Sequence, residues 1–180
     1  RQVYDLLGGR FRDTVPLYSN VWFDEDCTTP ETFAAAAKQY LVDLGHSACK
    51  LDPFLEMRAY HSVAHNGQIS QAGEQLGYDI VAAVRETVGP QHEILIDAHG
   101  HYDVPTAIRL ANNLYEQSNI GWFEEPVAPE DRDGYRELRA GLKVNIAGGE
   151  AEFTRWGWRT LLEARALDIA QPEVCGLGGI

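Results

Sequence analysis

The sequence has little of three things: cysteine, positive charge and long apolar runs. Its three cysteines, Cys27, Cys49 and Cys175, form neither a disulfide framework nor a metal-binding motif. Reduced thiols are typical of the cytoplasm, and the N-terminal residues include no apolar stretch of signal-peptide length, so we expect a cytoplasmic protein. No run of residues is apolar and long enough to cross a membrane.

Positive charge is scarce, because 15 Lys and Arg residues oppose 27 Asp and Glu residues and give a net charge of −12. A chain of this charge is repelled by phosphate backbones and anionic lipids, which disfavours nucleic-acid and membrane partners. Low-complexity tracts and Pro/Ser linkers are also absent from the sequence. We therefore expect residues 1–180 to form one domain or part of one.

The sequence does have a regular alternation of short apolar strands and amphipathic helices. The predicted strands are 15–20, 48–51, 94–97, 120–124, 144–147 and 168–171, and the predicted helices are 32–44, 73–88, 104–115, 131–140 and 154–163. A long loop, 53–73, separates the second strand from its helix. This alternation predicts an α/β fold with parallel strands, either an open doubly wound sheet or a (β/α)8 barrel.

Polar residues at the strand ends favour the barrel, because barrels gather their chemistry at the C-terminal ends of their strands. Successive strand ends carry Lys50 and Asp52, Asp97 and His99, Glu124, Glu150, and Gln171 and Glu173. The acids recur about once per β/α unit. Side chains two residues apart on a strand share a face, so Lys50 shares a direction with Asp52, and Asp97 with His99.

Three of these acids, Asp97, Glu124 and Glu150, suggest a metal site. Carboxylates that converge on one pocket repel one another unless a cation lies among them. A set of oxygen donors alone suits Mg²⁺. The alternative is that each acid caps the helix that follows its strand, but the regular recurrence favours the metal.

Four stretches resemble one family: LIDAHGHYDVPTAIRLANNL, IGWFEEPVAPED, AGGEAEFTRW and DIAQPEVCGLGGI. They are similar to the enolase superfamily, in its mandelate racemase and muconate lactonizing enzyme branch, and most of all to acid-sugar dehydratases of the galactonate dehydratase type. The resemblance implies a capping domain and a TIM-type barrel whose third, fourth and fifth strands supply the Mg²⁺ ligands, here Asp97, Glu124 and Glu150. Residues 1–180 would then be an incomplete enolase-type barrel domain of about six β/α units, without the capping domain and last strands.

The resemblance also implies a reaction, the Mg²⁺-dependent dehydration of an aldonate or aldarate by a hydro-lyase. A proton is removed α to the carboxylate, giving an enediolate, and the β-hydroxyl leaves as water. Lys50 would face the substrate carboxylate, and His99 would be the general acid for the leaving hydroxyl. Racemase-like members carry Lys-x-Lys on the second strand; Asp52 stands at the second of these positions and disfavours two-base racemisation. His101 has the opposite parity and is expected to point away.

Two further parts of the site are implied. The base is expected on a seventh strand outside the chain, oriented by an acid at the position of Glu173. The long loop holds Arg58, Tyr60 and His61, which suit a polyhydroxy acid, although a mobile surface loop is an equal alternative. Glu150 is expected to contact substrate as well as metal.

Other functions remain open from the sequence. An epimerase, racemase or cycloisomerase of the same superfamily would use the same residues, and would exchange solvent deuterium into product without loss of water. A non-catalytic, truncated barrel remnant is the alternative outside enzymes. Six strands leave two open sheet edges, so we expect homo-oligomerisation or altered sheet closure, with a small-molecule acid sugar as ligand.

Overall fold

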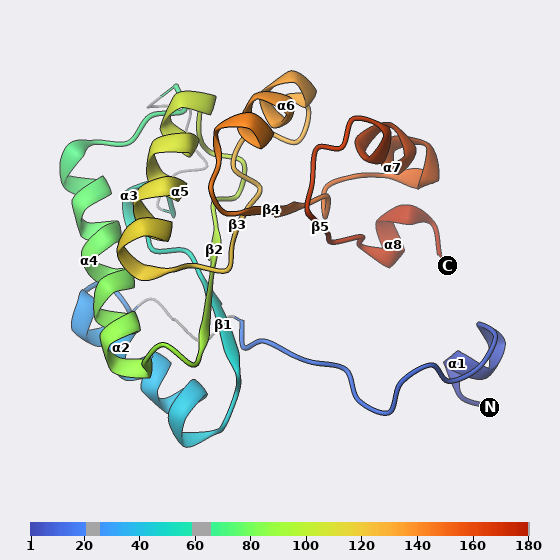
Figure 1. The fold of residues 1–180 in the computed structure, drawn as a ribbon, viewed down its shortest axis with the longest axis horizontal. Coiled ribbons are helices and arrows are strands. Elements are labelled where there is room, and N and C mark those ends of the chain that lie inside the picture. Colours follow the sequence, from blue (N-terminus) through green and yellow to red (C-terminus); the bar gives the residue numbers. More distant parts are fainter. Residues whose placement is uncertain (21–25, 59–65, 180) are drawn as a thin grey trace.

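Five parallel strands form one sheet in the computed structural model of the chain, which describes residues 1–20, 26–58 and 66–179 (Figure 1). The strands lie side by side in chain order: β1 (Ala48–Leu51), β2 (Glu93–Asp97), β3 (Trp122–Glu124), β4 (Asn145–Gly148) and β5 (Ile169–Ala170). Every neighbouring pair is parallel. The predicted α/β fold class is therefore confirmed.

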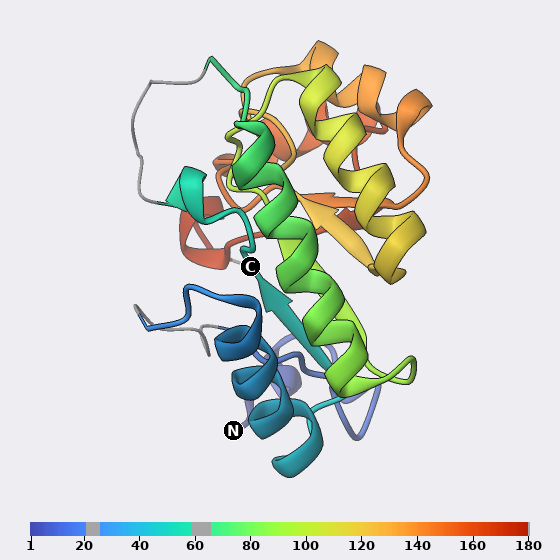
Figure 2. The same cartoon turned by 90° about the vertical axis from the view of Figure 1, so that its left-hand side faces the viewer.

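The longer helices lie on one side of this sheet (Figure 2). The helices are α1 (Val3–Leu6), α2 (Pro30–Ala37), α3 (Leu55–Arg58), α4 (Gln71–Val88), α5 (Val104–Ser118), α6 (Arg132–Gly141), α7 (Thr154–Glu163) and α8 (Val174–Leu177), with a π-helix, η1 (Lys38–Asp43), directly after α2. Each βα connection crosses over the same face, which is the arrangement of a barrel wall.

The hydrophobic core fills the space between the sheet and its helices. Strand residues that belong to this core therefore point toward the helices. Ile94 and Ile96 of β2 belong to the core cluster, whereas Leu95 does not. Since side chains alternate along a strand, Asp97 points with Leu95 to the face opposite the helices. Phe123 lies in the core in the same way, which turns Glu124 to that opposite face.

The prediction of a strand at residues 15–20 is wrong. Only Ser19 pairs with the sheet, through a single parallel bridge to Cys49 in which Ser19 N–H donates to Ala48 O at 2.9 Å and Lys50 N–H donates to Ser19 O at 2.9 Å. Val15 and Leu17 are 66% and 70% exposed, so little apolar burial stabilises the segment. Among the described residues the sheet thus has five strands and one bridge, where the sequence predicts six strands.

Four of the five predicted helices have different bounds, and two of them differ only slightly: α5 ends at Ser118 instead of 115, and α6 spans Arg132–Gly141 instead of 131–140. The helix predicted at 32–44 begins at Pro30, after the N-cap Thr29, and changes from α to π geometry at Lys38. The predicted loop 53–73 contains the short helix α3, and α4 begins at Gln71 because Ser70 accepts the Gly73 N–H at 3.0 Å and caps the helix.

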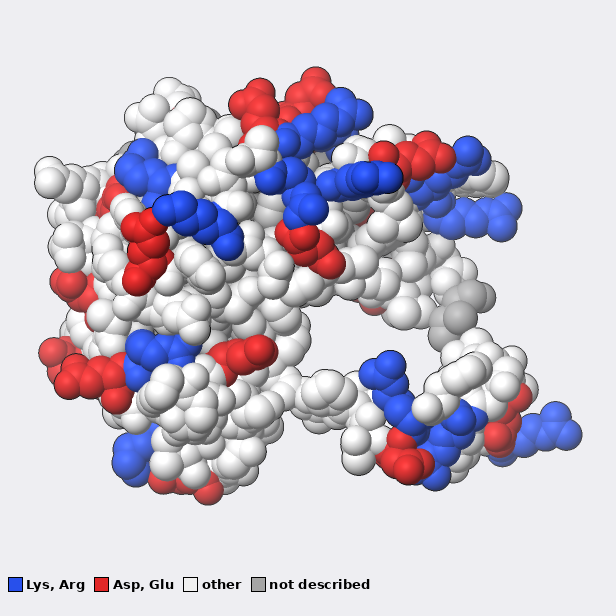
Figure 3. Space-filling model, in the orientation of Figure 1, with Lys and Arg blue, Asp and Glu red and all other residues white. Residues whose placement is uncertain are grey.

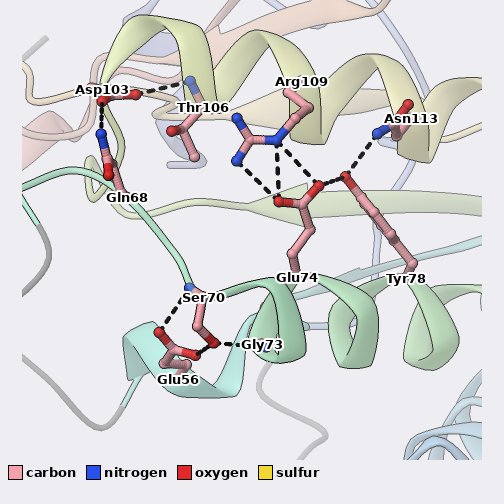
Figure 4. A network of polar contacts seen from close by, with 10 residues as sticks. All are labelled: Glu56, Gln68, Ser70, Gly73, Glu74, Tyr78, Asp103, Thr106, Arg109 and Asn113. Atoms are coloured by element: carbon pink, nitrogen blue, oxygen red, sulfur yellow. Dashed lines mark hydrogen bonds and ion pairs between the residues drawn. The ribbon is translucent and has the colours of Figure 1, made fainter.

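A polar network joins α4 to α5, the helix that follows the Asp97 loop (Figure 4). Arg109 of α5 donates to both carboxylate oxygens of Glu74 of α4, at 3.0 to 3.2 Å. Tyr78 donates to the same carboxylate at 2.7 Å, and Asn113 donates to the Tyr78 hydroxyl at 3.0 Å. Asp103 caps α5 by accepting the Thr106 N–H at 2.8 Å. These contacts fix the two helices against each other behind the sheet.

The N-terminal segment extends away from the sheet, and the molecule is hollowed between this segment and the C-terminal part (Figure 3). On the visible face, cationic and anionic side chains alternate, with no large region of a single sign. No helix in the described part of the chain is apolar and long enough to cross a membrane.

Candidate active site

Two of the predicted metal ligands lie side by side at the ends of neighbouring strands. Asp97 and Glu124 are opposite each other in the register of β2 and β3. The Lys50 ammonium lies between them, 2.8 Å from Asp97 Oδ2 and 2.6 Å from Glu124 Oε1. All three residues are buried, with exposed fractions of 6%, 7% and 1% for Lys50, Asp97 and Glu124. The two carboxylates therefore converge on one cation position.

The electrostatics of this cluster follow from burial and pairing. Burial, followed by the neighbouring charge of Asp97, raises the pKa of Glu124, although the hydrogen bond from Lys50 opposes the rise. Burial alone would lower the pKa of Lys50, but the hydrogen bonds and charges of Asp97 and Glu124 outweigh it and raise the pKa. Lys50 is thus held as a cation, and removal of its charge would leave the two acids in direct repulsion.

Further polar groups surround Glu124. The Trp122 indole N–H donates to Glu124 Oε2 at 3.1 Å, and the Gln171 side chain also hydrogen-bonds to this carboxylate. Tyr18 packs edge-on against the Trp122 ring, with ring centroids 5.4 Å apart. Trp122 is not among the candidate residues that the sequence indicates. Trp122 lies two residues before Glu124 on the same strand, so the two side chains lie on the same face. This spacing is the signal that indicates the contact between them.

His99 lies between two carboxylates. Its Nδ1 is 3.3 Å from Asp97 Oδ1, and its Nε2 is 3.6 Å from Asp52 Oδ2. Asp52 is buried and is held in place because its Oδ1 accepts the Phe54 N–H at 3.1 Å. The His99 side chain is 48% exposed, so the ring remains accessible to a ligand. The prediction that His101 points away is wrong, since its ring lies edge-on to that of His99 with centroids 6.0 Å apart.

An open pocket of about 290 Å³ lies on the face opposite the helices. Its lining residues are Tyr18, Asn20, Lys50, Glu124, Glu150, Gln171, Pro172 and Glu173. The third predicted ligand, Glu150, follows β4 and is exposed at this pocket. Across residues 1–20, 26–58 and 66–179, no three His, Cys, Asp or Glu side chains are grouped closely enough to hold a metal ion. Asp97 and Glu124 are brought together, and Glu150 lines a pocket with Glu124 without joining the pair.

The donor chemistry nevertheless fits a hard divalent cation. The Lys50 ammonium already serves as a stand-in ion, bound by one oxygen each of Asp97 and Glu124. Both groups, like Glu150, are carboxylates, which Mg²⁺ prefers. A divalent ion at this position would replace the ammonium as the counter-charge of the two acids.

The remaining predicted residues take other positions. Glu173 lines the pocket and also caps α8, with its carboxylate accepting the Cys175 N–H at 3.1 Å and the Gly176 N–H. These backbone hydrogen bonds lower the pKa of Glu173. Arg58 ends α3, and nothing of its side chain is described. Tyr60 and His61 lie outside the described residues.

Glu125 is a buried acid that the sequence reading does not single out. It is 6% exposed, and its Oε1 has no hydrogen-bond partner within the described part of the chain. Burial, followed by the charges of Glu150 and Asp97, raises the pKa of Glu125 to about 7. Its φ of +39° and the φ of +51° at His99 are left-handed, and such conformations cost about 1–3 kcal/mol each and cluster at functional sites.

Comparison with known proteins identifies relatives of this chain in one family. The family model described as "Enolase C-terminal domain-like" matches residues 32–180. The chain is 35% identical over 178 residues to the D-gluconate dehydratase of Thermoproteus tenax, covering 99% of this chain and 34% of that protein. It is 36% identical over 174 residues to the D-galactarolactone cycloisomerase of Agrobacterium fabrum, covering 97% and 41%. The chain thus spans less than half the length of these curated relatives.

A solved structure agrees with the sequence matches. A member of the enolase superfamily from Salmonella Typhimurium superposes with a TM-score of 0.87 at 32% identity, over 99% of this chain and 48% of that chain. The described sheet, the helices from α3 onward and the strand-end acids lie within the matched region. The chain therefore belongs to the enolase superfamily, as part of the enolase C-terminal-like barrel domain.

Proposed function

We propose that this chain is the barrel portion of a Mg²⁺-dependent acid-sugar dehydratase that converts an aldonate or aldarate to a 2-keto-3-deoxy acid. The observation that carries the proposal is the convergence of Asp97 Oδ2 and Glu124 Oε1 on one cation position, within 2.8 Å and 2.6 Å of Lys50 Nζ. The similarity to a D-gluconate dehydratase supports the substrate class.

Asp97, Glu124 and Glu150 would hold the ion, the last after movement of the turn that follows β4. When bound, Mg²⁺ supplies the fixed positive charge that a carboxylate needs while its α-carbon loses a proton. Lys50, released from the two acids, would bind a carboxylate oxygen of the substrate through Nζ. Its place at the pocket wall beside Glu124 and Glu150 favours this role.

His99 would protonate the leaving β-hydroxyl. Its Nδ1 lies toward Asp97 and its Nε2 toward Asp52, so the two acids orient the ring. The ring, whose side chain is 48% exposed, would deliver its Nε2 proton to the hydroxyl on turning away from Asp52. Glu173, which lines the pocket, would orient the base that removes the α-proton.

A cycloisomerase is the second candidate, favoured by the 36% identity to a D-galactarolactone cycloisomerase. Both reactions move a proton next to a carboxylate, and they differ in whether water is lost. The residues at the pocket wall suit either, because the charge on the substrate carboxylate must be neutralised in both.

The test is an assay of the whole enzyme that contains this barrel portion, on a panel of aldonates and aldarates with Mg²⁺, in deuterated water. We expect 2-keto-3-deoxy acid, loss of this activity in Glu124→Gln, and full activity in the exposed control Glu137→Gln. Deuterium incorporation without loss of water would support the cycloisomerase instead. Absence of both products across the panel would overturn the enzyme proposal.

A further inference from the structure

Tyr18 lies at the wall of the open pocket, although its segment is not a strand. The parallel bridge between Ser19 and Cys49 fixes this part of the chain beside β1. Bridged residues point to the same face, and Cys49 belongs to the hydrophobic core on the helix side. Side chains alternate along the chain, so Tyr18 and Lys50 both point to the opposite face. The two side chains line the same pocket of about 290 Å³.

The aromatic ring of Tyr18 lies beside the Lys50 ammonium. Lys50 Nζ is 6.0 Å from the ring centroid, which is about the reach of a cation–π attraction. The ring meets that of Trp122 edge-on, with centroids 5.4 Å apart. Trp122 is fixed in turn, because its indole N–H donates to Glu124 Oε2 at 3.1 Å. The Tyr18 ring is therefore held at a defined position next to the ammonium.

A divalent ion bound by Asp97 and Glu124 would take both of these ion pairs from the Lys50 ammonium and would repel it. The lysine is only 6% exposed, and a buried charge that loses its counter-charges is costly. The ammonium therefore needs another favourable position close by. A carboxylate there would neutralise the lysine, whereas an aromatic face attracts a cation and leaves its charge in place.

We propose that Tyr18 is a positioning residue, whose ring holds the Lys50 ammonium at the pocket wall while a divalent ion occupies its place between Asp97 and Glu124. The inference rests on the proposed function, because it assigns to Tyr18 the placement of the lysine that binds the substrate carboxylate. Tyr18 precedes residues 32–180, which the family model matches, so the assignment does not follow from that match. The ring face carries this role, and the hydroxyl does not.

Mg²⁺ calorimetry on the whole enzyme that contains this barrel portion tests the role. Tyr18→Leu removes the aromatic face, so the ammonium should compete more strongly with the ion for the two acids. We expect the Mg²⁺ affinity of this variant to fall by about 2- to 30-fold, which is the range for a cation–π contact. Tyr18→Phe retains the face and should bind Mg²⁺ as the unmodified enzyme does. The control Tyr115→Leu changes a tyrosine that is equally exposed, at 37%, and should leave the affinity unchanged.

The same substitution in a Lys50→Met background separates positioning from packing. Without the ammonium, a positioning role predicts that Tyr18→Leu no longer changes the Mg²⁺ affinity. An equal loss of affinity in both backgrounds would show that Tyr18 only supports the packing of the site. Unchanged affinity in Tyr18→Leu alone, or an equal loss in Tyr18→Phe, would show that the ring face does not act on Lys50. Each of these results overturns the proposal.

A readout that needs no ion uses the double variant Asp97→Asn, Glu124→Gln, in which both charges are removed and the side-chain volumes are kept. The Lys50 ammonium should then move onto the Tyr18 ring, whose ring current should shift the Lys50 Hε protons upfield in spectra of ¹³C-labelled lysine. Lys50→Arg identifies the signal, and adding Tyr18→Leu should abolish the shift. Absence of the shift in the double variant refutes the positioning role. If the unmodified enzyme binds no Mg²⁺, the proposed function fails, and this shift alone decides whether Tyr18 holds Lys50.

Discussion

Lys50→Met is the substitution whose consequences follow most directly from the site. The Lys50 side chain is 7% exposed and neutralises Asp97 and Glu124, whose side chains are 10% and 1% exposed. Loss of one partner of a buried ion pair costs about 3–5 kcal/mol because the other charge is left without compensation. We therefore expect Lys50→Met to lower the free energy of unfolding by about 3–5 kcal/mol in the absence of divalent ions.

The same substitution should make the protein respond more strongly to Mg²⁺. In the unmodified protein the ion must displace the ammonium, whereas in Lys50→Met the two acids are already unpaired. An ion at 100 times its Kd adds about 2.7 kcal/mol of stability, so Mg²⁺ should restore much of the loss. Urea unfolding followed by circular dichroism, with and without Mg²⁺, measures both effects.

Lys143→Met is the matched control, because Lys143 pairs with Glu116 at the surface, where both side chains are more than half exposed. Exposed ion pairs contribute about 0–1 kcal/mol, and we expect this variant to be nearly as stable as the unmodified protein with or without Mg²⁺. The reasoning is refuted if Lys50→Met is as stable as the control, or if Mg²⁺ stabilises it no more than the unmodified protein.

Three other expectations concern the helices behind the site. Burial would raise the pKa of Glu74, but hydrogen bonds from Arg109 and Tyr78 outweigh burial and lower this pKa below its ordinary 4.5. The ionised Glu74 therefore stabilises the fold above pH 4.5, and this contribution is lost as the pH falls through the lowered pKa. As the pH is lowered across this acidic range, the urea midpoint of Glu74→Gln should therefore fall less steeply than that of the unmodified protein. Gly77→Ala should lower the melting temperature, because the added Cβ would lie 2.4 Å from the Phe54 ring. Asp103→Ala removes the N-cap of α5 and should cost about 1 kcal/mol in the same urea unfolding assay.

The strands that carry the acids could be predicted because each is a short apolar run followed by a polar residue. The β1 bounds agree with the predicted 48–51, and α7 agrees with 154–163. The segment 15–20 has a similar pattern, but a strand needs a partner along its length, and only Ser19 bonds to β1. Local sequence does not encode that pairing.

The site was predictable as long as strand alternation applied. Lys50, Asp97 and Glu124 lie on the face that alternation assigns to them, and they meet. Beyond a strand end the rule fails, because residues such as His99 and Glu125 have a positive φ that redirects the chain. The ring contact of His101 with His99 and the burial of Glu125 depend on that change of direction, which the sequence does not reveal.

The most direct test of the account is Mg²⁺ calorimetry on the unmodified protein and on Asp97→Asn, Glu124→Gln and Glu150→Gln. We predict one bound ion per chain in the unmodified protein and weaker binding in each of the three variants, with Glu137→Gln unchanged. Absence of binding in the unmodified protein, or unchanged binding in Glu124→Gln, would contradict a metal site at these strand ends.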